Sequence, residues 1–137
     1  RLSLVGSEMC IRDRYYSNRR KQMFYTSGIS THFDLPQRVY QFMQSVYPRL
    51  KNTDIEVIHT DLTEDNVFGW TLENNDQNEI EIHDNLTEKD YITTLIHELV
   101  HVDQNLRGLR DDTERENEAY KLEKPLTNQF LGGKNNV

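Results

Sequence analysis

The sequence predicts a small α+β domain, and three observations support this class. Apolar residues recur at helical spacing early in the chain, at Val39, Phe42, Met43 and Val46. Short segments rich in β-branched residues follow in the middle of the chain. Two further segments with helical patterns come after them. The expected order is therefore a helix, three strands that form one sheet, and two helices.

We expect one folded domain over residues 23–131. Residues 2–14 (LSLVGSEMCIRDR) have neither a helical nor a strand period, and they resemble the translated sequencing adapter that contaminates some metagenome-derived protein predictions. Residues 1–22 are therefore expected to be non-native or disordered, with Met23 as a plausible true start. Residues 132–137, which begin with two glycines, are expected to form a disordered tail.

Composition excludes several classes of protein. The net charge of −7 argues against general nucleic-acid binding. The chain has no run of about 18 apolar residues, which a membrane-spanning helix needs. Its single cysteine, Cys10, lies in the suspect segment, so neither a disulfide nor a thiolate zinc site is available. We expect a cytoplasmic monomer that binds neither nucleic acid nor membrane.

The first helix is expected to begin after Asp34, with Pro36 in its first turn, and to end near Val46 or Tyr47 before Pro48. The three expected strands are Ile55–His59, Val67–Leu72 and Glu79–His83. The polar link Asn74–Asn78 implies a hairpin between the last two strands. Of the histidines in this part of the chain, His32 and His59 are expected at the surface.

The next helix carries the most informative motif, His-Glu-Leu-Val-His at residues 97–101. Thr87 is a plausible N-cap with Asp90 as its partner, and Gly108 ends the pattern. Residues four apart lie on one face of a helix, so His97 and His101 can point at one metal ion. Their face lies at the rim of an apolar stripe formed by Ile92, Leu95, Ile96, Leu99 and Val100.

This pattern supplies the parts for metal-assisted hydrolysis. Zinc binds imidazole and carboxylate ligands in a tetrahedral arrangement, and a catalytic zinc keeps one position for water. Glu98 projects about 100° away from His97 around the helix, where it flanks the site without ligating the metal. A carboxylate in that place can take a proton from the water. Glu98 is therefore the candidate general base, and Asp103 and Gln104 are candidates to support the ligands.

A third ligand is expected from the following helix. Residues 111–123 have a helical pattern that begins with Asp111 or Asp112 as its cap, and Pro125 is expected to close it. One face of this helix carries Glu116, Ala119, Tyr120 and Glu123 at spacings of three and four.

His-Glu-Leu-Val-His followed by Glu116-x-x-Ala119 resembles the gluzincin branch of zinc metallopeptidases, in its small single-domain forms. The resemblance implies a minimal zincin-like fold and Glu116 as the third zinc ligand. Those families often place Asp or Asn after the alanine, whereas this chain has Tyr120, so Glu118 stays open as an alternative ligand. Glu114, Glu118 and Glu123 are otherwise expected to face solvent.

The resulting expectation is a zinc-dependent peptidase that cuts an extended peptide or protein substrate. By resemblance, residues 68–71 would form an edge strand along the cleft, although Trp70 could equally be a core residue. His83 and Tyr120 are candidate electrophiles that would stabilise a developing oxyanion. SprT-like proteases, which act near DNA, are not favoured, because the chain has no basic DNA-binding module.

Two other interpretations of the sequence stay open. The first is a non-enzymatic, zinc-stabilised protein-binding domain, in which Asp112, Glu118 or His83 would close the metal site as a fourth ligand. The second is a domain that carries the motif by chance and binds no metal.

Overall fold

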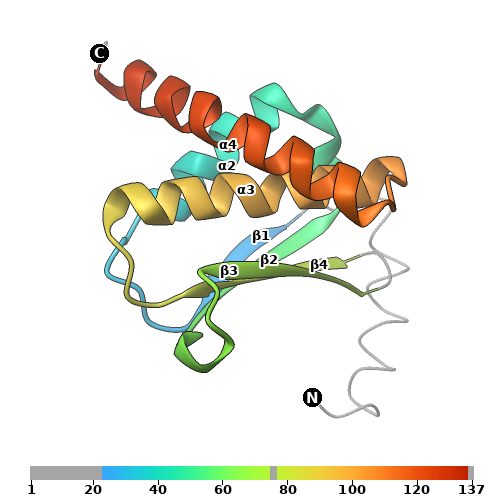
Figure 1. Ribbon diagram of the computed structural model, residues 1–137. Helices are drawn as coiled ribbons and strands as arrows, with labels where there is room; N and C mark the ends of the chain where they lie inside the picture. Colours follow the sequence, from blue (N-terminus) through green and yellow to red (C-terminus); the bar gives the residue numbers. More distant parts are fainter. Residues whose placement is uncertain (1–22, 75–76, 136–137) are drawn as a thin grey trace.

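A computed structural model describes residues 23–74 and 77–135, which form a four-stranded sheet with three α-helices on one of its faces (Figure 1). The strands are β1 (Phe24–Ser27), β2 (Asp54–Thr60), β3 (Gly69–Asn74) and β4 (Gln77–His83). The helices are α2 (Leu35–Val46), α3 (Glu88–Arg107) and α4 (Asp112–Asn135), with short 3₁₀ turns η1 (Pro48–Asn52) and η2 (Thr63–Asp65). The expected α+β class is confirmed. The suspect segment 1–22 lies outside the described residues.

The strand order in the sheet is β1-β2-β4-β3. The expected hairpin is confirmed, since β3 and β4 pair antiparallel, and β3 lies at the edge of the sheet. The prediction of three strands is wrong, because β1 adds a fourth that pairs in parallel with β2. This strand has four residues and one partner, so its stability depends on a distant segment. Phe24, Tyr25 and Thr26 favour strands, but a segment this short shows no strand pattern by itself.

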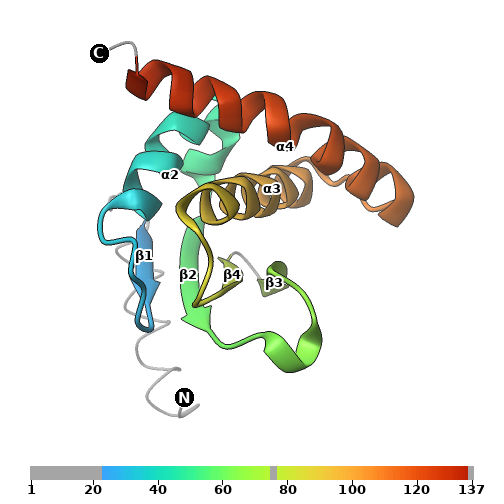
Figure 2. The ribbon, with the colours of Figure 1, turned by 60° about the vertical axis from the view of Figure 1, so that its left-hand side comes forward.

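Helix α3 forms the centre of the molecule, between the sheet and α4 (Figure 2). Alternate residues of β2 and β4 face it, and the core cluster includes Ile55, Val57, Ile80, Ile82, Leu95, Ile96 and Leu99, none of them exposed. Burying each of these side chains contributes roughly 1.5–3 kcal/mol. The apolar stripe that the sequence predicts is therefore the face that fixes α3 on the sheet. Among the described residues, no helix is both long and apolar enough to cross a membrane.

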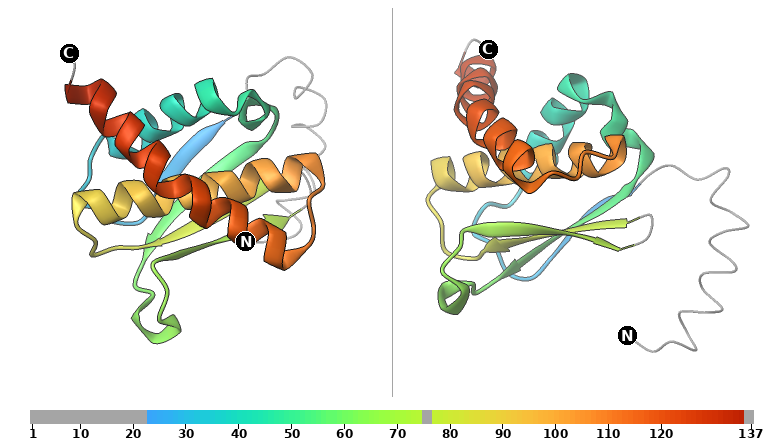
Figure 3. Two further views of the ribbon diagram at one scale, coloured as in Figure 1. Left: turned by 45° about the horizontal axis from the view of Figure 1, so that its top comes forward. Right: turned by 45° about the vertical axis from the view of Figure 1, so that its right-hand side comes forward.

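Both ends of α3 are fixed as the sequence predicts. The Thr87 hydroxyl accepts a hydrogen bond from the Asp90 backbone N–H at 3.2 Å. Gly108 ends the helix with φ of 76°, a conformation that glycine adopts without steric cost. The chain then turns back, so that α4 crosses over α3 (Figure 3). This return brings residues of α4 beside the histidines of α3.

Helix α4 is longer than expected. It continues through Pro125 to Asn135, so the predicted end at Pro125 is wrong, while the disordered tail over residues 132–137 stays a prediction. A proline inside a helix removes one backbone hydrogen bond and disfavours the preceding turn. Packing beyond the proline offsets this cost, because Leu126 and Phe130 are buried in the core. The Thr127 hydroxyl also donates to the Glu123 carbonyl across the proline, at 2.7 Å.

His59 is buried, with 6% of its surface exposed, although it was expected at the surface. Its Nδ1 lies 3.0 Å from the Ser27 carbonyl oxygen, and its Nε2 lies 2.7 Å from the Tyr91 hydroxyl. Burial raises the pKa of Tyr91, so this hydroxyl stays protonated and can donate to Nε2. A neutral His59 therefore satisfies both neighbours and ties β1 and β2 to α3.

We expect acid to destabilise the fold through His59. Burial lowers its pKa below 6.5, with a smaller lowering from His32, while the Ser27 carbonyl and Asp84 raise it. His59 then binds a proton more readily in the unfolded chain than in the folded one. Its contribution to the free energy of unfolding is therefore complete above about pH 6.5, and it is lost as the pH falls towards the pKa of His59 in the folded protein. His59 alone can change the free energy of unfolding by at most about 1.4 kcal/mol per pH unit.

The measurement is urea unfolding of the metal-free protein between pH 7.5 and 5, with His59→Gln as the comparison. Below pH 6.5, the free energy of unfolding should fall less steeply with pH in the variant than in the wild type. Equal slopes in both proteins would contradict a buried neutral His59.

Candidate metal centre

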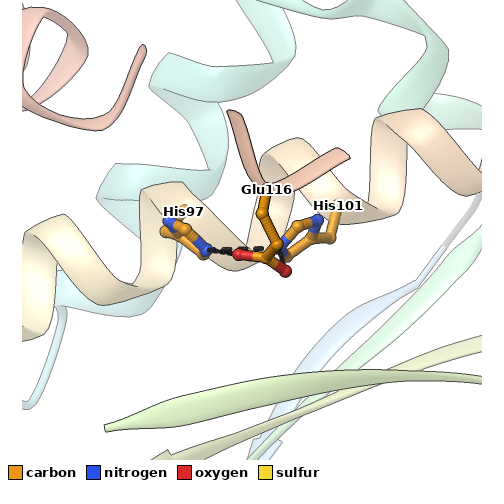
Figure 4. A group of neighbouring side chains, drawn as sticks. All are labelled: His97, His101 and Glu116. Carbon is orange, nitrogen blue, oxygen red and sulfur yellow. Dashed lines mark hydrogen bonds and ion pairs between the residues drawn. The ribbon is translucent and has the colours of Figure 1, made fainter. Parts of the chain in front are cut away.

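Three side chains from two helices meet at one point above the edge of the sheet. His97 and His101 come from consecutive turns of α3, and Glu116 reaches down from α4 (Figure 4). The two Nε2 atoms lie 3.2 Å apart. Glu116 places Oε1 3.4 Å from His97 Nε2 and Oε2 3.1 Å from His101 Nε2. The described residues thus bring together the three predicted ligands, and this group could hold a metal ion.

The spacing of these atoms fits a tetrahedral metal site. With metal–ligand bonds of about 2.0–2.1 Å, the edge of a tetrahedron is about 3.3 Å. The two Nε2 atoms are 3.2 Å apart, close to this value, and each lies 3.4 or 3.1 Å from a different oxygen of the Glu116 carboxylate. Nitrogen and carboxylate donors also match what zinc accepts. In the described part of the chain, the group has three members and no fourth protein ligand.

Gln104 fixes the orientation of His101. This glutamine is fully buried, and its amide Nε2 donates to the Arg115 carbonyl and to the Glu118 carboxylate of α4, at 3.0 and 2.7 Å. Its Oε1 is therefore the atom that lies 2.7 Å from His101 Nδ1. An oxygen acceptor there requires a protonated Nδ1, which leaves the lone pair of Nε2 directed at the other two ligands.

Glu123 has the same role for His97. Its carboxylate lies 2.7 Å from His97 Nδ1, with 18% of the side chain exposed. A carboxylate in this position accepts the Nδ1 proton and leaves Nε2 free for a metal. The prediction that Glu123 faces solvent is wrong. A signal was present in the sequence, because Glu123 follows Glu116 by seven residues, which is about two helical turns.

Glu118 also differs from the prediction of a solvent-facing acid. It pairs with Arg107 and accepts a hydrogen bond from Gln104, so it holds the supporting network of α3 and α4 together. It is not a member of the ligand group. Of the two acids that the sequence left open as third ligand, the geometry therefore favours Glu116. Asp103 supports the same region, through contacts with Arg49 and Arg107.

Glu98 lies beside the ligand group and faces the edge strand. It is 5% exposed, and its Oε1 accepts a hydrogen bond of 2.7 Å from the Thr71 hydroxyl of β3. Burial raises the pKa of Glu98, while the Thr71 hydroxyl and the nearby histidines lower it. A raised pKa makes this carboxylate a better proton acceptor, as a general base requires.

The two candidate electrophiles have different surroundings. Tyr120 is 65% exposed, and its ring lies edge-on to His97 with 4.7 Å between the centroids, so its hydroxyl can move within reach of a bound substrate. His83 lines the same cavity, but its Nδ1 accepts the backbone N–H of Leu62 at 3.0 Å and faces Asp61 at 3.8 Å. His83 is thus tied to the loop before β3 and is not part of the ligand group.

A cavity of about 1080 Å³ lies in front of these residues, between β3, α3 and α4. It is lined by residues of the ligand group, by Glu98 and by the edge strand, including Gly69, Trp70 and Thr71. A Cβ at Gly69 would lie 2.9 Å from Thr94 Cγ2 and 2.9 Å from the Glu81 carbonyl oxygen. The glycine therefore lets β3 lie close to α3. Trp70 is 37% exposed, so its interpretation as a core residue is wrong.

The free edge of β3 faces this cavity. The His83 N–H bonds to the Phe68 carbonyl, and in an antiparallel pair the residues that bond to the partner strand alternate with those that point away. By this alternation, the backbone groups of Gly69 and Thr71 point away from β4. These groups are available to pair with an added strand.

Comparison of the chain with protein-family models, curated proteins and solved structures gives no match. Functional inference therefore depends on the site itself.

Proposed function

We propose that this protein is a zinc-dependent peptidase with His97, His101 and Glu116 as ligands and Glu98 as general base. The observation that carries the proposal is the joint geometry of the centre. The two imidazole Nε2 atoms lie 3.2 Å apart and both face the Glu116 carboxylate, and the buried carboxylate of Glu98 lies beside them at the edge of an open cavity. These are the elements that metal-assisted hydrolysis of an amide requires.

The roles of the residues follow from their positions. A zinc ion held there would supply Lewis acidity, which polarises a carbonyl group and makes water more acidic. Glu98 accepts the proton of the attacking water and passes it to the leaving amine, and Thr71 orients the carboxylate for both transfers. Tyr120 donates a hydrogen bond to the oxyanion from the open side of the cavity. The tie between His83 and Leu62 makes His83 the weaker candidate for this role.

The proposed substrate is an extended peptide or protein segment that pairs with β3. The outward backbone groups of Gly69 and Thr71 can hold such a segment without selecting its side chains. Thr71 also bonds to Glu98, so the strand that binds the substrate also positions the base. A minimal zincin-like fold is part of the proposal. Its support is the edge strand, the motif helix and the following helix that supplies a carboxylate.

The alternative of a zinc-stabilised binding domain required a fourth protein ligand. Of the three candidates, Asp112, Glu118 and His83, none belongs to the described ligand group. A position left for water supports the peptidase.

Metal content tests the proposal directly. We expect the purified, zinc-supplemented chain to hold stoichiometric zinc, and Glu116→Ala to lower the zinc affinity by about 10-fold or more, because one of three ligands is removed. Glu118→Ala is the matched control on the same helix. It loses the ion pair with Arg107 and the hydrogen bond from Gln104, but it removes no ligand, so it should keep stoichiometric zinc. Zinc that survives Glu116→Ala but not Glu118→Ala would move the third ligand, and a wild-type chain without zinc would overturn the proposal.

A further inference from the structure

Arg115 occupies a special place in the cleft. It directly precedes the ligand Glu116 in the first turn of α4 and lines the cavity in front of the centre. It also lines a smaller adjoining hollow of about 240 Å³ near the end of β3, together with Thr71, Asn105 and Asp112. The guanidinium group therefore lies at the boundary between the metal centre and one end of the cleft.

The position of Arg115 is fixed from both sides. Its backbone carbonyl accepts a hydrogen bond from the buried Gln104, at 3.0 Å. Its Nη1 donates to the Leu109 carbonyl at 2.8 Å. One of the five N–H donors of the guanidinium group is thus used to hold the side chain in place. Within the described part of the chain, the others have no acceptor and can bind a ligand that enters the cleft.

Two features of Arg115 oppose the ordinary preferences of an arginine. An arginine keeps its charge in water or beside a partner, yet the half-buried Arg115 has no carboxylate of the described residues within 4.0 Å of its guanidinium group as an ion pair. The first turn of a helix also disfavours a cation, because the positive end of the helix dipole is there. Local choices that cost stability are most often found at functional sites. A carboxylate from outside the chain would relieve both costs.

The direction of β3 indicates which part of a substrate would meet Arg115. Antiparallel pairing is the more stable way to add a strand at a sheet edge. A peptide antiparallel to β3 has its N-terminal part beside Glu73, at the end of the strand where the smaller hollow lies, and its C-terminal part beside Gly69. Glu98, bound to Thr71, lies between these two ends.

We propose that Arg115 makes this site selective for extended peptides that carry an Asp or Glu side chain on the N-terminal side of the cleaved bond. The inference depends on the proposed peptidase function for the place of the bond. The contact itself is a charge-assisted, two-point hydrogen bond between guanidinium and carboxylate, a geometry for which arginine is suited and lysine is not.

The test measures binding and cleavage separately. Three fluorescent peptide libraries, randomised except for a fixed Glu, Gln or Lys in the N-terminal half, are titrated against the zinc-loaded Glu98→Gln protein. A fourth library has the fixed Glu in the C-terminal half. Fluorescence anisotropy gives the affinities, and cleavage of the same libraries by the wild type, read by mass spectrometry, gives the position of the acid relative to the cut.

We expect the library with Glu in the N-terminal half to bind about 10-fold more tightly than the Gln library, as one charge-assisted contact predicts. Arg115→Gln should remove this preference, Arg115→Lys should restore part of it, and Arg115→Glu should shift it towards Lys. The matched control is Arg38→Ala, which removes an equal charge that pairs with Asp34 and lines neither hollow. This control should keep the preference.

Three results would overturn the inference. They are equal binding of the Glu and Gln libraries, equal losses in the Arg115 and Arg38 variants, and a preference for Glu in the C-terminal half. Thermal unfolding of each variant separates these results from misfolding. Failure of the proposed peptidase looks different, because Arg115-dependent binding would then persist without cleavage by the wild type.

Discussion

Glu98→Gln should reduce peptide hydrolysis by about 10³-fold or more while the zinc content stays at the wild-type level. General acid–base catalysis contributes about 10²–10⁴-fold, and Glu98 is the buried carboxylate beside the ligand group. Glutamine has nearly the same shape and can still accept the Thr71 hydroxyl bond, but it cannot take a proton from water. The loss should therefore fall on kcat, with little change in KM.

The measurement combines zinc content with cleavage of a peptide library by the same samples. Glu88→Gln is the matched control, since it makes the same substitution at an exposed position of α3 and should keep the wild-type rate. Retained turnover in a zinc-loaded Glu98→Gln protein would remove Glu98 as the base. Loss of both zinc and turnover would instead show that Glu98 is needed to build the site.

The centre of this site could be predicted from sequence because its spacing is local. His97 and His101 differ by one helical turn, and a helix places them on one face whatever the rest of the fold is. Thr87 and Gly108 cap their own helix, so both helix ends can also be predicted from the local sequence. The hairpin of β3 and β4 is also local, since a short polar link joins its strands.

The errors concern features that depend on distant partners. Strand β1 exists because it pairs with β2, about thirty positions later in the chain by its register with Ile55. Helix α4 continues past Pro125 because Leu126 and Phe130 pack in the core. Glu123 was assigned to solvent because its neighbour His97 lies on another helix, and the seven-residue spacing from Glu116 indicates a shared face but not what that face contacts.

Glu123→Ala should weaken zinc binding by about 10–100-fold while the fold is kept. The carboxylate holds Nδ1 of His97 as a donor and fixes the ring, and removal of such an outer partner typically has this effect on metal affinity. Zinc affinity is measured by competition with a chelating dye. Glu114→Ala is the matched control, because Glu114 is an exposed acid on the same helix and the substitution changes the net charge equally.

Glu123→Gln separates the two contributions of this side chain. An amide oxygen can still accept the Nδ1 proton, as Gln104 does for His101, so the ring stays oriented while the negative charge is lost. If orientation dominates, Glu123→Gln should recover most of the affinity that Glu123→Ala loses. If the charge dominates, both variants should bind zinc equally weakly. Wild-type affinity in Glu123→Ala would mean that His97 needs no support from Glu123, and the contacts of α4 with the centre would then be those of Glu116 and of the Gln104 network.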